Sequence, residues 1–426
     1  MKSQSYLYVL VGALWVLALA KWFENPRGTI EPTFLQSLGA RVNPVTVKRP
    51  KDDPGYVIPE KRLTQPQAVL PTANPSVQLG AKSRSKLQPT IDRYIQTLTT
   101  NGFMSQNQGV WIQQGSEPIA HHRGSVALPG ASLTKVATTL VALHTLGAEH
   151  RFWTQVAVTG PIQNGVLEGD LLVQGGGDPL FVWQSAFQLG RLLNQRGIRQ
   201  VQGDLVILGP FAMNFERDPL TAGTLLKQAW NREAGNPRIS ILGQVRTASP
   251  NQVAAESWFV RYPSKPLIGL LKQMNLYSNN VMAEMIGQAI GGSRSLNRTT
   301  LQLTGLSASE IRFINASGLG RANRVSPRAA CALFTAIQSH LKTQNRDIRE
   351  VFPIATIDRG TLANRHLPPG TIGKTGTLRN VSTLVGLLPE QSGPPVCFAI
   401  LNSGGDLQSL RRQQDRLVQS IGKIEG

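Results

Sequence analysis

Ser132 and Lys135 stand three residues apart at the head of an apolar run, and together they could supply a hydroxyl nucleophile and its base. The apolar residues that follow recur at intervals of three and four, which predicts a helix with one buried stripe. Residues at i and i+3 share a helix face, so the amine could take the serine proton if burial lowered its pKa. Pro129-Gly130 would end the preceding strand. On its own, a serine in this place is more often only a helix cap.

Two later motifs favour a catalytic role for Ser132 over a helix cap. Ser278-Asn279-Asn280 offers a hydroxyl that could relay a proton and an amide that could hold a lysine and a substrate carbonyl. A second lysine motif, Lys374-Thr375-Gly376-Thr377, has the β-branched and glycine content of a strand that something approaches closely. Lys374 and Thr375 could bind a carboxylate, and Gly376 would leave room for a substrate chain. The N–H groups of Thr377 and Ser132 could form an oxyanion hole.

Gly373-Lys374-Thr375 could also belong to a phosphate-binding P-loop. That motif requires a glycine where this chain has Pro368, and a helix where Val381 begins a strand-like run. The chain also lacks the Gly-x-Ser-x-Gly and His-Glu-x-x-His motifs, and its six histidines are scattered. The sequence therefore predicts neither a metal nor a cofactor.

The three motifs, in this order, resemble those of penicillin-binding proteins and serine β-lactamases. From about residue 86 to the end, the chain is similar to the DacB (penicillin-binding protein 4, peptidase S13) family of D-alanyl-D-alanine carboxypeptidases. Further segments that carry this resemblance are Leu167-Glu168-Gly169-Asp170-Leu171, Gly175-Gly176-Gly177-Asp178-Pro179 and Gly360-Thr361-Leu362. The resemblance implies that Ser132 is the nucleophile and Lys135 its base. It also implies that Ser278 and Asn280 relay the proton, and that Lys374 and Thr375 bind a substrate carboxylate.

Two departures from the family pattern stand out. Asn315-Ala316-Ser317-Gly318-Leu319 occupies the place of the usual Asp-Gly-Ser-Gly-Leu, which leaves the role of that loop open. No Glu-x-x-x-Asn element follows the second motif in the way that class A β-lactamases use it. We therefore expect β-lactams to acylate the protein without rapid hydrolysis.

The resemblance implies an α+β fold of the penicillin-binding and serine β-lactamase type, in which terminal helices flank an antiparallel sheet beside a helical subdomain. Apolar periodicity agrees with this, predicting a helix from Leu87, a hairpin over 109–124 and a last helix over 407–424. Gly169-Asp170-Leu171-Leu172-Val173 and Gly203-Asp204-Leu205-Val206-Ile207 are near repeats, which predict a small inserted α/β subdomain over 152–240. Asp170 and Asp178 are expected to be turn residues.

The N-terminal part reads differently. An apolar run before Lys21 predicts a signal peptide or a retained signal anchor over 1–24. Nine prolines then mark 25–85 as a linker, before a catalytic domain over 86–426. We expect an exported enzyme, periplasmic or anchored to the outer face of the cytoplasmic membrane.

The formal charge of +19 is spread along the chain, and no nucleic-acid-binding motif accompanies it. Anionic membrane lipids or cell-wall polymers are the more plausible partners of an exported basic protein. Cys331 and Cys397 are expected to be buried thiols, although export would permit a disulfide. No oligomeric state is predicted.

The function predicted is serine-type D-Ala-D-Ala carboxypeptidase, with endopeptidase activity open, acting on peptidoglycan stem peptides and inhibited by β-lactams. The alternative is a catalytically weak penicillin-binding protein that recognises the cell wall.

Overall fold

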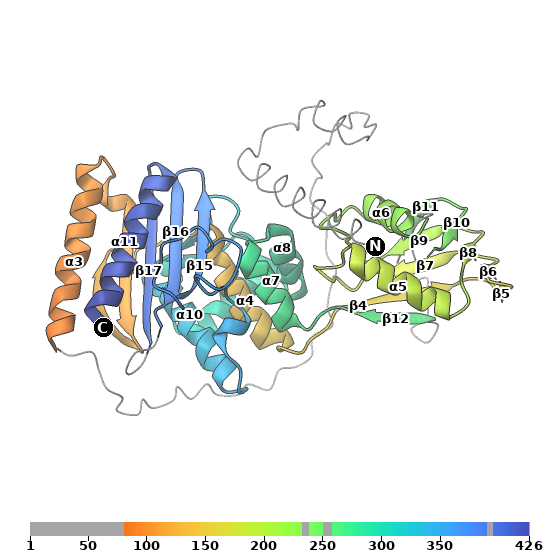
Figure 1. Ribbon diagram of the computed structural model, residues 1–426, viewed down its shortest axis with the longest axis horizontal. Coiled ribbons are helices and arrows are strands. Elements are labelled where there is room, and N and C mark those ends of the chain that lie inside the picture. The colour runs from red at the N-terminus through yellow and green to blue at the C-terminus, as the bar shows by residue number, and fades with distance from the viewer. Residues whose placement is uncertain (1–80, 232–237, 250–257, 390–394, 426) are drawn as a thin grey trace, which may run out of the picture. The chain divides into compact units, whose positions relative to one another are not determined.

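A five-stranded antiparallel sheet organises the catalytic part of the chain in this computed structural model, which describes residues 81–231, 238–249, 258–389 and 395–425 (Figure 1). Its strands run in the order β15, β16, β17, β1, β2. Their bounds are Ile372–Leu378, Val381–Leu387, Val396–Ser403, Gln108–Gln114 and Glu117–His122. The predicted hairpin and C-terminal strands are therefore confirmed. β15, which carries the second lysine motif, lies at one edge.

Strands β16 and β17 are buried on both faces. In β17, Cys397 and Ala399 belong to one hydrophobic cluster, whereas Phe398 and Ile400 belong to another. This alternation follows from the two-residue period of a strand. The terminal helices α3 (Ala81–Thr100) and α11 (Leu407–Glu425) cover one face, and α10 (Pro327–Lys342) covers the other (Figure 1).

The opposite face packs against a helical layer. Its helices are α4 (Thr134–Leu146), α7 (Leu267–Tyr277), α8 (Asn280–Ala289), α9 (Gly292–Thr304) and α10 (Pro327–Lys342). In α4, every residue from Thr134 to Leu143 is buried, so this helix is enclosed on all sides and not along one stripe alone. A lysine in its first turn is consequently removed from water.

The inserted subdomain contains two small sheets. One has the strand order β11, β9, β7, β4, β12, and the other β10, β8, β6, β5. The bounds are β4 Trp153–Val158, β5 Ile162–Gln163, β6 Val166–Leu167, β7 Leu171–Gln174, β8 Gln200–Val201, β9 Leu205–Leu208, β10 Ser240–Ile241, β11 Val245–Ala248 and β12 Val260–Pro263. The predicted repeats form β7 and β9, which pair in parallel. β12 pairs with β4, so this sheet continues to Pro263, beyond the predicted end at 240.

Helices α5 (Trp183–Gln195) and α6 (Pro219–Asn231) alternate with these strands. Asp170 and Asp204 lie at the turns that lead into β7 and β9. The Asp170 carboxylate accepts the N–H of Asp204, the Asp204 carboxylate accepts the N–H of Gln244, and both carboxylates contact Arg246. Asp178 accepts the N–H of Leu180, and burial raises its pKa to about 6. The turn roles predicted for Asp170 and Asp178 are thus confirmed.

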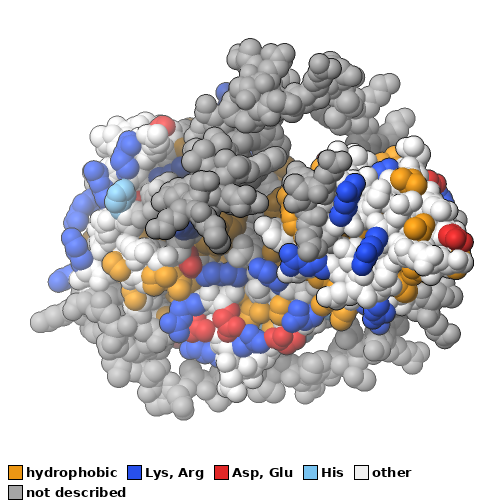
Figure 2. Space-filling view, turned by 45° about the vertical axis from the view of Figure 1, so that its right-hand side comes forward, with side chains coloured by type: hydrophobic (Ala, Val, Ile, Leu, Met, Phe, Trp, Pro, Cys, Tyr) orange, Lys and Arg blue, Asp and Glu red, His pale blue; other side chains and the backbone are white. Residues whose placement is uncertain are grey.

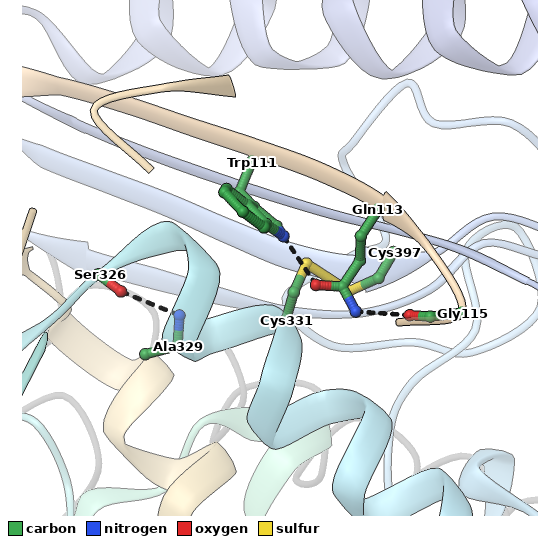
Figure 3. Close-up of a disulfide and its surroundings, with 7 residues drawn as sticks. All are labelled: Trp111, Gln113, Gly115, Ser326, Ala329, Cys331 and Cys397. Carbon is green, nitrogen blue, oxygen red and sulfur yellow. Dashed lines mark hydrogen bonds between the residues drawn. A yellow bond between two sulfur atoms is a disulfide. The ribbon is translucent and has the colours of Figure 1, made fainter. Parts of the chain in front are cut away.

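Cys331 and Cys397 form a disulfide, so the expectation of two free buried thiols was wrong. The bond joins α10 to β17, with the two Cα atoms 5.9 Å apart (Figure 3). Nearby, Trp111 donates its ring N–H to Gln113 (2.7 Å), and Ser326 caps α10 by accepting the N–H of Ala329 (2.9 Å). Two residues that each looked like a core position in sequence face one another because α10 packs directly on β17.

Short elements complete the described chain. They are the strands β3 (Leu128–Pro129), β13 (Ile311–Arg312) and β14 (Arg324–Val325), and the 3-10 turns η1 (Ser105–Asn107), η2 (Ala131–Leu133), η4 (Ala308–Glu310) and η5 (Ile348–Glu350). Helix α3 begins at Ala81, inside the segment predicted as linker, and the rest of that linker and the signal segment lie outside the described residues. Within the described ranges, no helix is long and apolar enough to cross a membrane.

Candidate active site

Ser132 lies in the 3-10 turn η2, between the short strand β3 and helix α4. Ala131 before it has a φ of 47°, an uncommon backbone conformation for a residue with a Cβ. Gly318 packs against this turn with a φ of 81°, and a Cβ there would overlap the Ala131 carbonyl oxygen. The serine is half-buried and the lysine of its motif fully buried. The predicted helix start is therefore present, with the hydroxyl at a strained turn.

Lys135 Nζ has three oxygen neighbours. It lies 3.0 Å from Ser132 Oγ, 2.7 Å from Asn280 Oδ1 and 2.7 Å from the Ser317 carbonyl oxygen. The amide and carbonyl oxygens can only accept, so a neutral amine would donate its two hydrogens to them. Its lone pair would then face the serine hydroxyl, which is the arrangement that a general base requires.

The electrostatic surroundings favour the neutral amine. Burial lowers the pKa of Lys135 well below its usual value, and the positive charge of Lys374 lowers it further. The carboxylate of Glu284 acts in the opposite direction.

Ser278 and Asn280 flank the junction of two helices. Ser278 has a φ of 54° and ends α7, while the side chain of Asn279 accepts the N–H of Met282 and so caps α8. This junction turns Asn280 toward Lys135 and places Ser278 Oγ 2.9 Å from Lys374 Nζ. The structure thus brings the first and second motifs together.

Lys374 connects the second and third motifs from the edge strand β15. It is fully buried, it donates to the Thr375 carbonyl oxygen at 2.8 Å, and burial lowers its pKa to about 7. A Cβ at Gly376 would overlap Thr383 Oγ1 and lie 3.0 Å from the Ser132 nitrogen, so only glycine fits between strand and serine. Thr377 is exposed, and its hydroxyl accepts from Arg411 at 3.0 Å.

The departure from the family pattern at residues 315–319 is compensated locally. Asn315 Oδ1 accepts the N–H of Gly318 at 2.8 Å, as a carboxylate oxygen could. Ala316 is accommodated because α8 has Gly287 opposite it, where a Cβ would overlap the Ala316 Cβ. The loop therefore keeps its hydrogen bonds, and its Ser317 carbonyl reaches Lys135.

Three contributors to the site were not predicted. The Ser317 carbonyl has no side-chain signature. Thr383 of β16 was not predicted either, although its hydroxyl donates to the Gly130 carbonyl oxygen at 3.0 Å. Glu284 accepts the N–H of Ser317 at 2.9 Å, and its position four residues after Asn280 was the one available hint. Among the described residues, no three His, Cys, Asp or Glu side chains gather as a metal site would require.

This fold, with a serine and two buried lysines converging on one edge strand, defines a class: acyl-transfer enzymes of the penicillin-binding type. The sequence pattern of the D-Ala-D-Ala carboxypeptidase 3 (S13) family matches residues 91–208 and 210–423. The chain belongs to this family and is a serine-type D-Ala-D-Ala carboxypeptidase, as the three motifs predicted.

Named relatives agree with this assignment. D-alanyl-D-alanine carboxypeptidase DacB of Haemophilus influenzae is 26% identical, with 75% of this chain and 88% of the relative covered. The solved structure of penicillin binding protein 4 from the same organism matches with a TM-score of 0.62 at 22% identity, covering 77% of this chain and 99% of that one. Bd3459, a predatory peptidoglycan endopeptidase from Bdellovibrio bacteriovorus, matches with a TM-score of 0.61 at 21% identity, covering 74% and 92%. The structural matches confirm the predicted fold class.

Proposed function

We propose that Ser132 is the nucleophile that attacks the carbonyl between the two terminal D-alanines of a peptidoglycan stem peptide, with Lys135 as its base. The observation that carries this proposal is the set of three contacts of Lys135 Nζ, of which the serine hydroxyl is the only one able to give up a proton. The amine takes that proton as the Oγ–carbonyl bond forms, leaving an ammonium beside Asn280.

The leaving amine needs a proton in the next step. Ser278 Oγ lies 2.9 Å from the ammonium of Lys374, so the hydroxyl can pass a proton to the amine and receive one from the lysine. Release of D-alanine leaves an ester between the peptide and Ser132. At this point Lys135 is an ammonium and Lys374 has lost a proton, so a proton returns through solvent from Lys135 to Lys374. The neutral Lys135 amine then deprotonates the water molecule that hydrolyses the ester, and the proton passes to Ser132 Oγ as the ester bond breaks.

Substrate binding in this proposal uses the outer edge of β15 after Gly373, because residues 353–355 pair with the strand only up to that point. A peptide lying along an edge strand gains main-chain hydrogen bonds, and the close approach of Gly376 to the Ser132 backbone brings this strand beside the nucleophile. The terminal carboxylate binds the Lys374 ammonium and the Thr375 hydroxyl. The N–H groups of Ser132 and Thr377 donate hydrogen bonds to the negatively charged oxygen of the tetrahedral intermediate.

The protein acts outside the cytoplasmic membrane, where its basic surface meets anionic lipids or wall polymers. Its 44 Lys and Arg residues exceed its 25 Asp and Glu residues. On the face seen in Figure 2, the blue Lys and Arg side chains are scattered over the described surface and form no single stripe. Such a distribution favours general attraction to an anionic wall over recognition of one nucleic-acid groove.

One labelling experiment tests the assignment. Benzylpenicillin should form a long-lived adduct on the peptide that contains Ser132, and Ser132→Ala should remain unlabelled. The adduct should also block release of D-alanine from a stem peptide. Mass analysis of cross-linked wall fragments would separate loss of D-alanine from cleavage of cross-links, and so carboxypeptidase from endopeptidase activity. An adduct on protein that never releases D-alanine would favour a recognition protein instead, and well-folded protein without any adduct would refute the proposed site.

A further inference from the structure

Helix α8 contacts the surroundings of Lys135 through two residues one turn apart. Asn280 accepts directly from the amine. Glu284, on the same helix face, reaches the loop beside it with both carboxylate oxygens. Its Oε1 accepts the N–H of Ser317 at 2.9 Å, and its Oε2 accepts the N–H of Ala316 at 3.3 Å.

These two hydrogen bonds hold the two peptide groups that directly precede the one whose carbonyl faces Lys135. The Ser317 carbonyl accepts from Lys135 Nζ at 2.7 Å, and the Ala316 carbonyl accepts from Thr138 Oγ1 at 2.7 Å. The loop is therefore held by the carboxylate on its N–H side and by α4 on its carbonyl side. A carboxylate can accept the two N–H groups with separate oxygens, whereas an amide in the same position would turn its NH2 group toward one of the two N–H donors.

We propose that Glu284 is a positioning residue for acylation, which holds the Ser317 carbonyl against Lys135 so that the amine keeps its lone pair on the Ser132 hydroxyl. This inference rests on the proposed role of Lys135 as base. If the carbonyl moved away, the amine would have only Asn280 as a fixed acceptor and could rotate toward other partners.

The carboxylate has a second effect through its charge. The charged groups that act on Lys135 are Lys374 on β15 and Glu284 on α8. Lys374 and burial favour the neutral amine, whereas Glu284 favours the ammonium and so raises the pKa against them. Glu284 therefore contributes to the pH at which the base becomes available.

The test is Glu284→Gln in the full chain, with the rate of acylation by benzylpenicillin measured across pH. Loss of positioning should lower the plateau rate by roughly ten- to a hundredfold. Removal of the negative charge should lower the pKa of Lys135, so the rising limb of the profile should move to lower pH. Glu284→Asp keeps the charge but shortens the side chain, so its plateau should be low while its rising limb stays closer to that of the unchanged protein.

Glu310→Gln is the matched control. The Glu310 carboxylate is also buried and also joins two segments, but its partners are Ser326 and Arg328. This variant should lose stability and keep the position of the rising limb. The inference is supported if the rising limb of the pH profile moves to lower pH in Glu284→Gln and keeps its position in Glu310→Gln.

The inference is overturned if Glu284→Gln acylates at the original rate, or if its rate falls while the limb stays in place, because a purely structural role would then suffice. Should Glu284→Gln fail to fold, an original acylation rate in Glu284→Asp would overturn it as well. Absence of acylation in the unchanged protein would instead refute the proposed function.

Discussion

The lowered pKa of Lys374 makes a specific prediction about how the enzyme binds a carboxylate. Burial lowers this pKa to about 7, so the side chain changes charge within the pH range in which the enzyme can be assayed. One pKa unit corresponds to a factor of about ten, or about 1.4 kcal/mol. In the free enzyme, the ammonium fraction should therefore fall from about nine tenths at pH 6 to about one tenth at pH 8.

The measurement compares benzylpenicillin with its methyl ester. Both acylate the same serine, but only the acid has a carboxylate for Lys374 to bind. The ratio of their acylation efficiencies at each pH cancels the titration of Lys135, which both substrates need equally. This ratio should fall about tenfold between pH 6 and pH 8.

Lys374→Met supplies the control, because methionine is unbranched, of similar length and uncharged. Its ratio should be low and independent of pH. A ratio that stays constant in the unchanged protein from pH 6 to pH 8 would refute the proposed binding of the carboxylate by Lys374. If the acylation efficiency of the methyl ester by itself fell equally steeply between pH 6 and pH 8, the titration of Lys374 would instead affect proton transfer through Ser278.

Three further predictions concern the base, the disulfide and the edge strand. Lys135→Ala should lower the acylation rate constant by at least about a hundredfold, measured by stopped-flow with a chromogenic cephalosporin, and near-normal acylation would mean that another group takes the proton. Replacing Cys331 and Cys397 together by alanine should lower the free energy of unfolding by about 4 kcal/mol in denaturant titrations, because the bond closes a loop with a sequence separation of 66, and a change below about 1 kcal/mol would contradict this. Gly376→Val should reduce acylation by about a hundredfold because its side chain would collide with Thr383 Oγ1 and displace the turn that carries Ser132, whereas Gly269→Ala, where nothing lies within 4 Å of the added Cβ, should acylate normally.

The sequence alone was sufficient for the local parts of the site. The spacing of Ser132 and Lys135 predicted a shared helix face, and the residues around Lys374 predicted a strand. Both predictions depend on contacts within a few residues of each motif, which is the range over which helix and strand periodicity acts. The order of three such motifs was also enough to indicate the family, because their residue types and sequence are specific together.

Tertiary structure decided how the motifs act on one another. The contacts from Lys135 to Asn280 and from Lys374 to Ser278 join segments about a hundred or more residues apart. Helix and strand periodicity extends over only a few residues, so it does not predict these contacts. Burial of the two lysines, which lowers both pKa values, depends on how completely α4 and β15 are enclosed. Every residue has a backbone carbonyl with the same chemistry as that of Ser317, so the amino-acid sequence does not distinguish this one.

The same reason explains the remaining differences. Cys331 and Cys397 each resembled an ordinary core residue, and only the packing of α10 on β17 brought their sulfur atoms together. Ala316 was a departure that left the role of the loop open, and only the fold places Gly287 opposite its methyl group. Composition and local pattern determined which chemistry this chain could perform, whereas the packing of distant elements determined which atoms meet, because side-chain distances and burial are properties of the folded chain.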